Sequence, residues 1–228
     1  MALIKPSSLI DEIRNKMGSV VFSSGNGGQY ARSLVIPYNP QSVDQVSARN
    51  RLITASQAWS GLTANQRTAW NLAAPDWERS GVFGQKVKLS GFNLYCFLNI
   101  NLAIVGVAPI SSPPAKTAVP ALTALSATQV HAGATTMVFT PTPLTAGASY
   151  VVEATSPQSA GKSFVSSEYR IIKFVAAGQT SPQVLTTDYN AKFGSPGLAG
   201  QRVFFRVTAI STTTGQPGAS LDCVATVS

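Results

Sequence analysis

Hydrophobic and polar positions follow two different patterns on either side of a proline-rich stretch at residues 109–120. Before this stretch, apolar residues recur every three or four positions behind helix-capping residues, and all three tryptophans lie there. After it, short runs alternate Thr, Ser and Val between turns that contain glycine and proline. The change predicts two domains, residues 1–108 and 121–228, joined by a linker at 109–120.

Capping boxes mark two helix starts in the first domain. Ser42 with Gln45, and Thr63 with Gln66, place side chains that can satisfy each other's backbone amides three residues apart. The first helix is expected to end before Gly61. The apolar residues expected on its buried side are Ala48, Leu52, Ala55 and Trp59.

Three further segments of this domain have hydrophobic patterns that predict secondary structure. An apolar stripe at residues 8–17 predicts a short amphipathic helix. The β-like runs at 20–22 and 34–36 flank the glycine-rich residues 24–28, which predicts a β-hairpin or an extended glycine loop. The run at 92–105 is apolar almost all round and predicts a buried helix, with a central strand as the alternative.

Asparagines interrupt this apolar run at Asn93, Asn99 and Asn101. An unpaired amide in a core costs about 1–3 kcal/mol, so we expect the three to face a subunit boundary, backbone groups or water.

In the second domain, strand-like runs lie between turn signals. They cover residues 136–140, 150–154, 169–175, 203–210 and 223–227. Residues 188–193 predict a helical turn within a connection. The whole sequence therefore predicts an α+β multidomain protein: a mainly helical N-terminal domain with a β-hairpin, then an all-β immunoglobulin-like sandwich.

The end of the chain resembles a fibronectin type III domain. Residues 200–211, the Gly-Pro turn after them and residues 220–227 are similar to its last two strands, and residues 150–154 are similar to its third. Phe204 stands where the family has a tyrosine, and this half of the chain has no tryptophan. The resemblance implies a sandwich of the kind used for display, with a host-surface ligand as a possible partner.

Residues 52–74 resemble a corner of high-mobility-group boxes, where a helix ending in tryptophan leads through a capped turn into another helix. The resemblance implies that Trp59 and Trp70 are core aromatics. It makes Arg49, Arg51 and Arg67 the candidate phosphate contacts if the likeness extends to nucleic-acid binding.

The stretch from the glycine loop to the proline-rich linker, residues 18–114, resembles uncharacterised bacteriophage and prophage proteins. That resemblance implies a virus particle as the setting. The candidate aromatics for the core or for assembly are Trp59, Trp70, Trp77, Phe92, Tyr95 and Phe97.

The amino-acid composition favours a folded protein, part of whose surface is covered by neighbouring subunits. Charged residues make up 11% of the chain and hydrophobic residues 44%, which excludes a disordered chain. So few charges suggest that neighbouring subunits cover part of the surface. The net charge is +8, and most of the excess lies before residue 119, which leaves a nucleic-acid contact as the minority interpretation.

No catalytic, metal-binding or cofactor-binding residues are expected. The chain has one histidine, His131, and two cysteines, Cys96 and Cys223, which we expect to be unpaired thiols. We therefore expect a protein that is not an enzyme. The N-terminal residues show no signal peptide, and the run at 92–105 is shorter than the ~20 residues that cross a bilayer.

These observations favour a structural component of a phage virion, associated with the capsid, neck or tail and made in the host cytoplasm. Its expected partners are copies of itself and other virion proteins, and its second domain is expected to face outward. One alternative is a DNA-binding or packaging-associated protein that uses the basic first domain. The other is a cellular adhesion or filament subunit.

Overall fold

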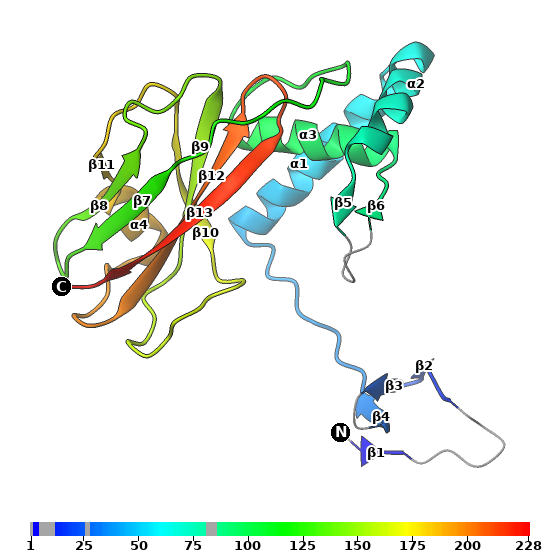
Figure 1. The fold of residues 1–228 in the computed structure, drawn as a ribbon. Helices are drawn as coiled ribbons and strands as arrows, with labels where there is room; N and C mark the ends of the chain where they lie inside the picture. The colour runs from blue at the N-terminus through cyan, green and yellow to red at the C-terminus, as the bar shows by residue number, and fades with distance from the viewer. Residues whose placement is uncertain (1, 5–11, 26–27, 81–85) are drawn as a thin grey trace. The chain divides into compact units, whose positions relative to one another are not determined.

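The computed structural model describes residues 2–4, 12–25, 28–80 and 86–228 (Figure 1). The chain forms two compact units, residues 1–46 and residues 47–228. They are called the N-terminal unit and the C-terminal unit, and each is described by itself.

The N-terminal unit is a small antiparallel sheet. Its strands, in the order β1-β4-β3-β2, are β1 (Ala2–Leu3), β4 (Gly28–Ser33), β3 (Val20–Gly25) and β2 (Asn15–Met17). The predicted hairpin is confirmed, because β3 and β4 pair through to Gly25 opposite Gly28. The second strand ends at Ser33, before the predicted run at 34–36.

The helix predicted over residues 8–17 is wrong where it can be checked. Residues 8–11 lie outside the described residues, and residues 15–17 form strand β2 instead. Asn15 adopts a φ of 89°, which a right-handed helix does not allow. A tight turn at residues 18–19 lets Lys16 pair with Val21, so pairing with β3 overrides the local apolar stripe.

Three main helices follow: α1 (Val43–Ser60), α2 (Ala64–Ala73) and α3 (Gly91–Ile104). Both predicted capping boxes form. The Gln45 amide donates to Ser42 Oγ at 3.4 Å and the Ser42 amide donates to Gln45 Oε1 at 3.3 Å. The corresponding bonds of Thr63 and Gln66 are 3.3 Å and 2.9 Å.

Short elements connect α2 to α3. A 3₁₀ turn (Ala74–Asp76) follows α2, and strands β5 (Arg79–Ser80) and β6 (Lys86–Val87) pair with each other. The predicted buried helix at 92–105 is confirmed as α3, whose Leu94, Leu98 and Leu102 side chains are fully buried.

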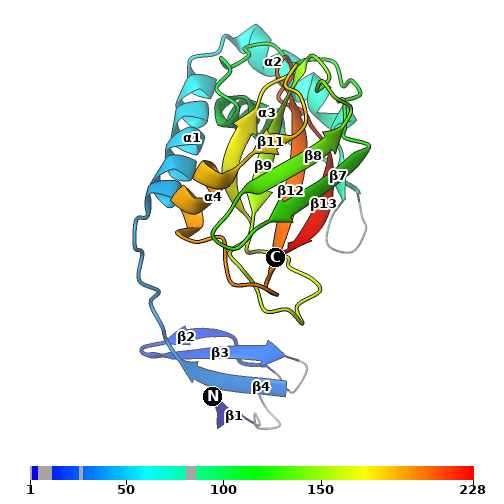
Figure 2. The ribbon, with the colours of Figure 1, turned by 90° about the vertical axis from the view of Figure 1, so that its left-hand side faces the viewer.

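The rest of the C-terminal unit is mostly strand. Its elements are β7 (Ala124–Gln129), β8 (Thr135–Thr140), β9 (Ala148–Ala154), β10 (Arg170–Val175), β11 (Gln183–Val184), α4 (Thr186–Phe193), β12 (Arg202–Ser211) and β13 (Pro217–Thr226). They form two antiparallel sheets, with strand orders β10-β9-β12-β13 and β11-β8-β7. Figure 2 shows the smaller sheet in front of the larger one. Met137 and Phe139 of the smaller sheet share a buried core with Val152 and Phe205 of the larger.

Helix α3 packs against the turn between β12 and β13, at the same end of the unit in both ribbon views (Figures 1 and 2). Asn101 Nδ2 donates to the Gly215 carbonyl at 2.9 Å. Gly215 lies so close to Leu98 that an added Cβ would overlap the Leu98 carbonyl oxygen. Helix α3 and the larger sheet therefore pack against each other at this turn.

The predicted fold class, a mainly helical N-terminal domain followed by an all-β immunoglobulin-like sandwich, is wrong. Residues 1–46 form a β unit of their own, and α2 and α3 belong to the same compact unit as the strands. That unit also contains helix α4, so its C-terminal part is not all-β. The physical reason lies in α3, which is apolar almost all round and packs against both α2 and the β12–β13 turn.

Candidate functional site

The predicted aromatic residues build a core around α1, α2 and α3. The Tyr95 ring lies 5.2 Å from Trp70, edge to face, and 5.3 Å from Trp59. The Trp59 ring lies 5.7 Å from Phe92. Trp70, Trp77 and Tyr95 are buried, whereas Trp59, Phe92 and Phe97 are partly covered. The structure thus gathers these side chains mainly for internal packing.

Polar atoms in this core bind the chain that leaves α3. Trp70 Nε1 donates to the Ser111 carbonyl at 2.8 Å. Buried Asn99 accepts from the Ile110 amide at 2.7 Å and donates to the Ile110 and Tyr95 carbonyls at 3.3 Å and 3.0 Å. Asn99 and Asn101 therefore find backbone partners within the chain, one of the three possibilities expected from the sequence, while Asn93 is exposed.

The three candidate phosphate contacts do not form one site. Arg67 Nη2 donates to the Ser60 and Leu62 carbonyls at 2.9 Å and 2.8 Å, so its guanidinium caps the end of α1. Arg49 is exposed on α1 and Arg51 is partly buried there. Because they are two positions apart on a helix, they point to nearly opposite sides. Arg49, Arg51 and Arg67 therefore do not point toward a common surface where a nucleic acid could bind.

An apolar segment between β4 and the middle of α1 is exposed. Its most exposed residues are Val35 at 67%, Ile36 at 84%, Tyr38 at 88%, Val43 at 85%, Leu52 at 51% and Ile53 at 50%. Ala48 and Leu52 were predicted on the buried side of the helix, and that prediction is wrong, because both are exposed. Only Ala55 of α1 is fully buried, because the core reaches α1 near its C-terminal end alone. We call residues 34–53 the exposed apolar segment.

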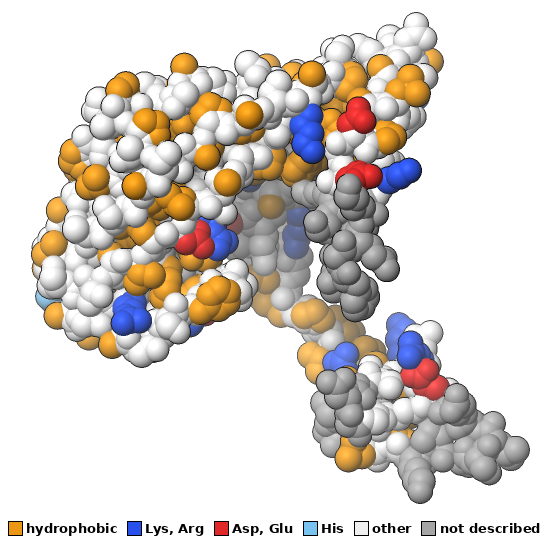
Figure 3. Space-filling model, viewed as in Figure 1, with side chains coloured by type: hydrophobic (Ala, Val, Ile, Leu, Met, Phe, Trp, Pro, Cys, Tyr) orange, Lys and Arg blue, Asp and Glu red, His pale blue; other side chains and the backbone are white. Residues whose placement is uncertain are grey.

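The surface of the C-terminal unit carries few charges. On the face shown in Figure 3, the few Lys, Arg, Asp and Glu side chains, some in opposite-charge pairs, are separated by wide areas of hydrophobic and uncharged polar side chains. Further exposed apolar side chains are Phe164 at 72% and Leu198 at 65%.

One polar row crosses the larger sheet. Arg206 donates to both carboxylate oxygens of Asp222 at 2.8 Å, and the Tyr169 ring lies 4.1 Å from the guanidinium carbon. This hydrogen bonding holds the pKa of Asp222 below its usual value. Burial raises the pKa of Glu153, the cross-strand neighbour of Arg206, although the Arg206 charge opposes that shift. Arg206 is thus fully engaged within the sheet.

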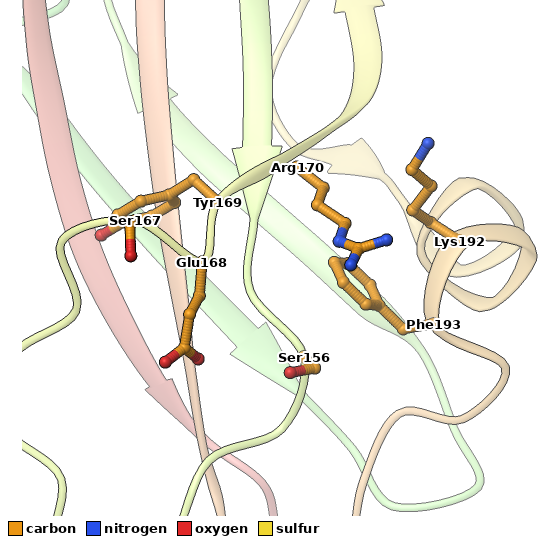
Figure 4. Close-up of a pocket in the computed structure, with 7 residues that line it drawn as sticks. All are labelled: Ser156, Ser167, Glu168, Tyr169, Arg170, Lys192 and Phe193. Atoms are coloured by element: carbon orange, nitrogen blue, oxygen red, sulfur yellow. The ribbon is translucent and has the colours of Figure 1, made fainter. Parts of the chain in front are cut away.

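A pocket that the sequence did not predict lies beside this row (Figure 4). Its volume is about 430 Å³. Its walls come from Ser156 after β9, from residues 167–170 leading into β10, and from Lys192 and Phe193 at the end of α4. The only sequence signal was the helical turn predicted over 188–193, which α4 confirms.

The groups that most often perform catalysis are separated. Burial raises the pKa of the Cys96 thiol, and it raises that of Cys223 to about 12, so both stay protonated near neutral pH. Neither forms a disulfide. His131 Nδ1 lies 2.6 Å from the Gly197 carbonyl oxygen in a connection between strands. Among the described residues, no three His, Cys, Asp or Glu side chains gather as metal ligands would.

No protein-family model and no curated protein matches this chain. Within the part of the chain that the structure describes, no helix has the length and apolarity to cross a membrane.

Proposed function

We propose that this protein is a structural component of a phage virion, which binds copies of itself and other virion proteins. The observation that carries the proposal is the exposed apolar segment, residues 34–53. Exposed apolar patches are uncommon on proteins that act alone and mark interaction sites, and residues 34–53 carry six large apolar side chains that are at least half exposed.

The energetics favour assembly through this segment. Burying one large aliphatic side chain contributes about 1.5–3 kcal/mol. Ile36, Val43 and Ile53 are each at least half exposed, so a neighbouring subunit that covered them would gain several kcal/mol. A similar gain is not available within the C-terminal unit, because its core covers α1 only near Ala55.

The low charge density supports the same proposal. With 11% charged residues, the chain has fewer charges than the quarter or so that soluble domains usually carry. The virion setting itself rests on the resemblance of residues 18–114 to phage and prophage proteins. In this proposal the protein is located in the virion.

Light scattering of the purified chain, followed by electron microscopy, tests the proposal. We expect a defined oligomer or a regular particle. Ile53→Asp should dissociate it, because a carboxylate on an apolar contact must be desolvated. Asn65→Asp adds the same charge at an exposed position of α2, outside the segment, and should leave the oligomer intact.

A monomer at every concentration would contradict the proposal. So would an oligomer that Ile53→Asp leaves unchanged, because the contact would then lie outside the segment that carries the argument. Circular dichroism of both variants shows whether α1 still forms.

A further inference from the structure

The pocket between β10 and α4 combines the groups that recognise an acidic sugar, and we propose that it binds the carboxylate-bearing ring of an acidic saccharide (Figure 4). This inference goes beyond the virion proposal and does not depend on it. A volume of about 430 Å³ is within the range of small-molecule sites.

Arg170 supplies the group that binds the carboxylate. It is exposed at the start of β10, and within the described residues its guanidinium makes no hydrogen bond or ion pair. The nearby Arg206 is not available in this way, because its Nε and Nη2 both donate to the Asp222 carboxylate. A guanidinium presents two parallel N–H donors that match a carboxylate, so Arg170 is available for such a pair.

The charge balance of the pocket favours a singly charged ligand. Arg170 and Lys192 are the cations of its lining, and Glu168 is the anion. Lys162, outside the lining, pairs with Glu168 at 2.7 Å and offsets its charge. The site is therefore positive, but the Glu168 carboxylate in its wall repels further negative charge, which suits one carboxylate better than a phosphate dianion.

The remaining walls suit hydroxyl groups and a ring. Ser156 Oγ accepts from Gln158 Nε2 at 3.1 Å, which leaves its own hydrogen to donate. Glu168 and Ser167 can accept from sugar hydroxyls. Phe193 offers an apolar surface and is supported by Tyr189, whose ring centre lies 4.8 Å away. Figure 4 shows Arg170 and Phe193 on one side of the pocket and Glu168 and Ser167 on the other.

Calorimetric titration of the full chain tests the proposal with two matched probes. Methyl galacturonoside carries the carboxylate, and methyl galactoside has a hydroxymethyl group in its place. We expect the acid to bind in the millimolar range and the neutral sugar to bind about tenfold more weakly. Inorganic phosphate, as a third probe, should bind more weakly than the acid.

Variants locate the site. Arg170→Met should weaken binding of the acid about tenfold, and Arg170→Lys should weaken it less, because it keeps the charge and loses the fork. Arg32→Met removes an exposed arginine from the N-terminal unit and should change nothing. Equal melting temperatures for these variants show that the fold is kept.

Three results would overturn the proposal. They are equal binding of the acidic and neutral sugars, acid binding that Arg170→Met leaves unchanged, and no acid binding at about 10 mM ligand. Tighter binding of phosphate would assign the pocket to phosphate anions and would equally refute the saccharide.

Discussion

At the scale of single residues, Gly215 is the tightest point of the C-terminal unit. Its φ is +71°, which L residues rarely adopt, and any Cβ there would overlap the Leu98 backbone. The residue therefore meets a conformational and a steric demand at once. Only glycine satisfies both.

Gly215→Ala should lower the free energy of unfolding by about 3 kcal/mol, because strain at positive φ adds to overpacking against α3. Urea denaturation measures the loss. Gly178→Ala is the matched control: its φ is +78°, but no atom lies within 4 Å of the added Cβ, so it should cost about 1 kcal/mol. Equal losses would mean that the contact with Leu98 matters little.

Partial burial of Cys223 raises the pKa of its thiol to about 12, from the value of 9 in an open chain. Its protonated form is therefore favoured by folding, and the resulting stability is complete below pH 9 and is lost between pH 9 and pH 12. In a Cys96→Ala background, Ellman's reagent should react at pH 8 about a thousandfold more slowly with native than with urea-unfolded protein. Similar rates would show that the thiolate forms readily in the folded state.

At the scale of elements, α3 is held by side chains that bind distant backbone. Asn99 contributes three hydrogen bonds to its own helix and to Ile110, and Asn101 contributes one to Gly215. These asparagines fix the direction in which the chain leaves the helix and the place where the β12–β13 turn meets it.

Asn99→Ala should destabilise the protein by about 2 kcal/mol, since it leaves the partly buried amide and carbonyl of Ile110 without their partner. Asn93→Ala changes an exposed position of the same helix and should stay within about 0.5 kcal/mol of the parent. Thermal unfolding of both variants checks the difference. A small effect of Asn99→Ala would mean that water replaces the amide.

Local signals predicted the two capped helices well, but they predicted a false helix over residues 8–17 and said little about packing. The capping boxes at Ser42 and Thr63 gave both helix starts, because their bonds join residues three apart. The strand at 15–17 was missed, since it exists through pairing with β3. The contact of Asn101 with Gly215 spans 114 positions, and no periodicity reports a contact of that range.

The same limit applies to the pocket. Ser156, Arg170 and Phe193 come from three separate segments, and each alone looks like an ordinary surface residue. Arg67 illustrates the reverse error: the resemblance to a high-mobility-group corner suggested phosphate binding, whereas its guanidinium binds two carbonyls of the helix corner.

At the scale of the whole molecule, the chain consists of two compact units with residues 34–41 outside helix and strand. Such an exposed, extended stretch is a preferred site of proteolysis. Tyr38, at 88% exposure, is a cleavage site for chymotrypsin.

Brief digestion of dissociated protein should therefore cut after Tyr38 and release a stable fragment that contains residues 47–228. In an assembled particle the same bond should be cut far more slowly, because the proposed contacts cover the exposed apolar segment. Mass spectrometry of timed digests gives both rates. Equal rates in the two states would place the assembly contact elsewhere.

The junction between α3 and the β12–β13 turn also decides where foreign peptides could be grafted. An insertion at Gly215 would push α3 away from the strands. The β12–β13 turn therefore cannot accept an inserted peptide. The turn at Gly178, where a side chain would meet open space, is the better place for a displayed epitope. Both turns lie at the same end of the larger sheet, where one is suited to a foreign peptide and the other must keep its native sequence.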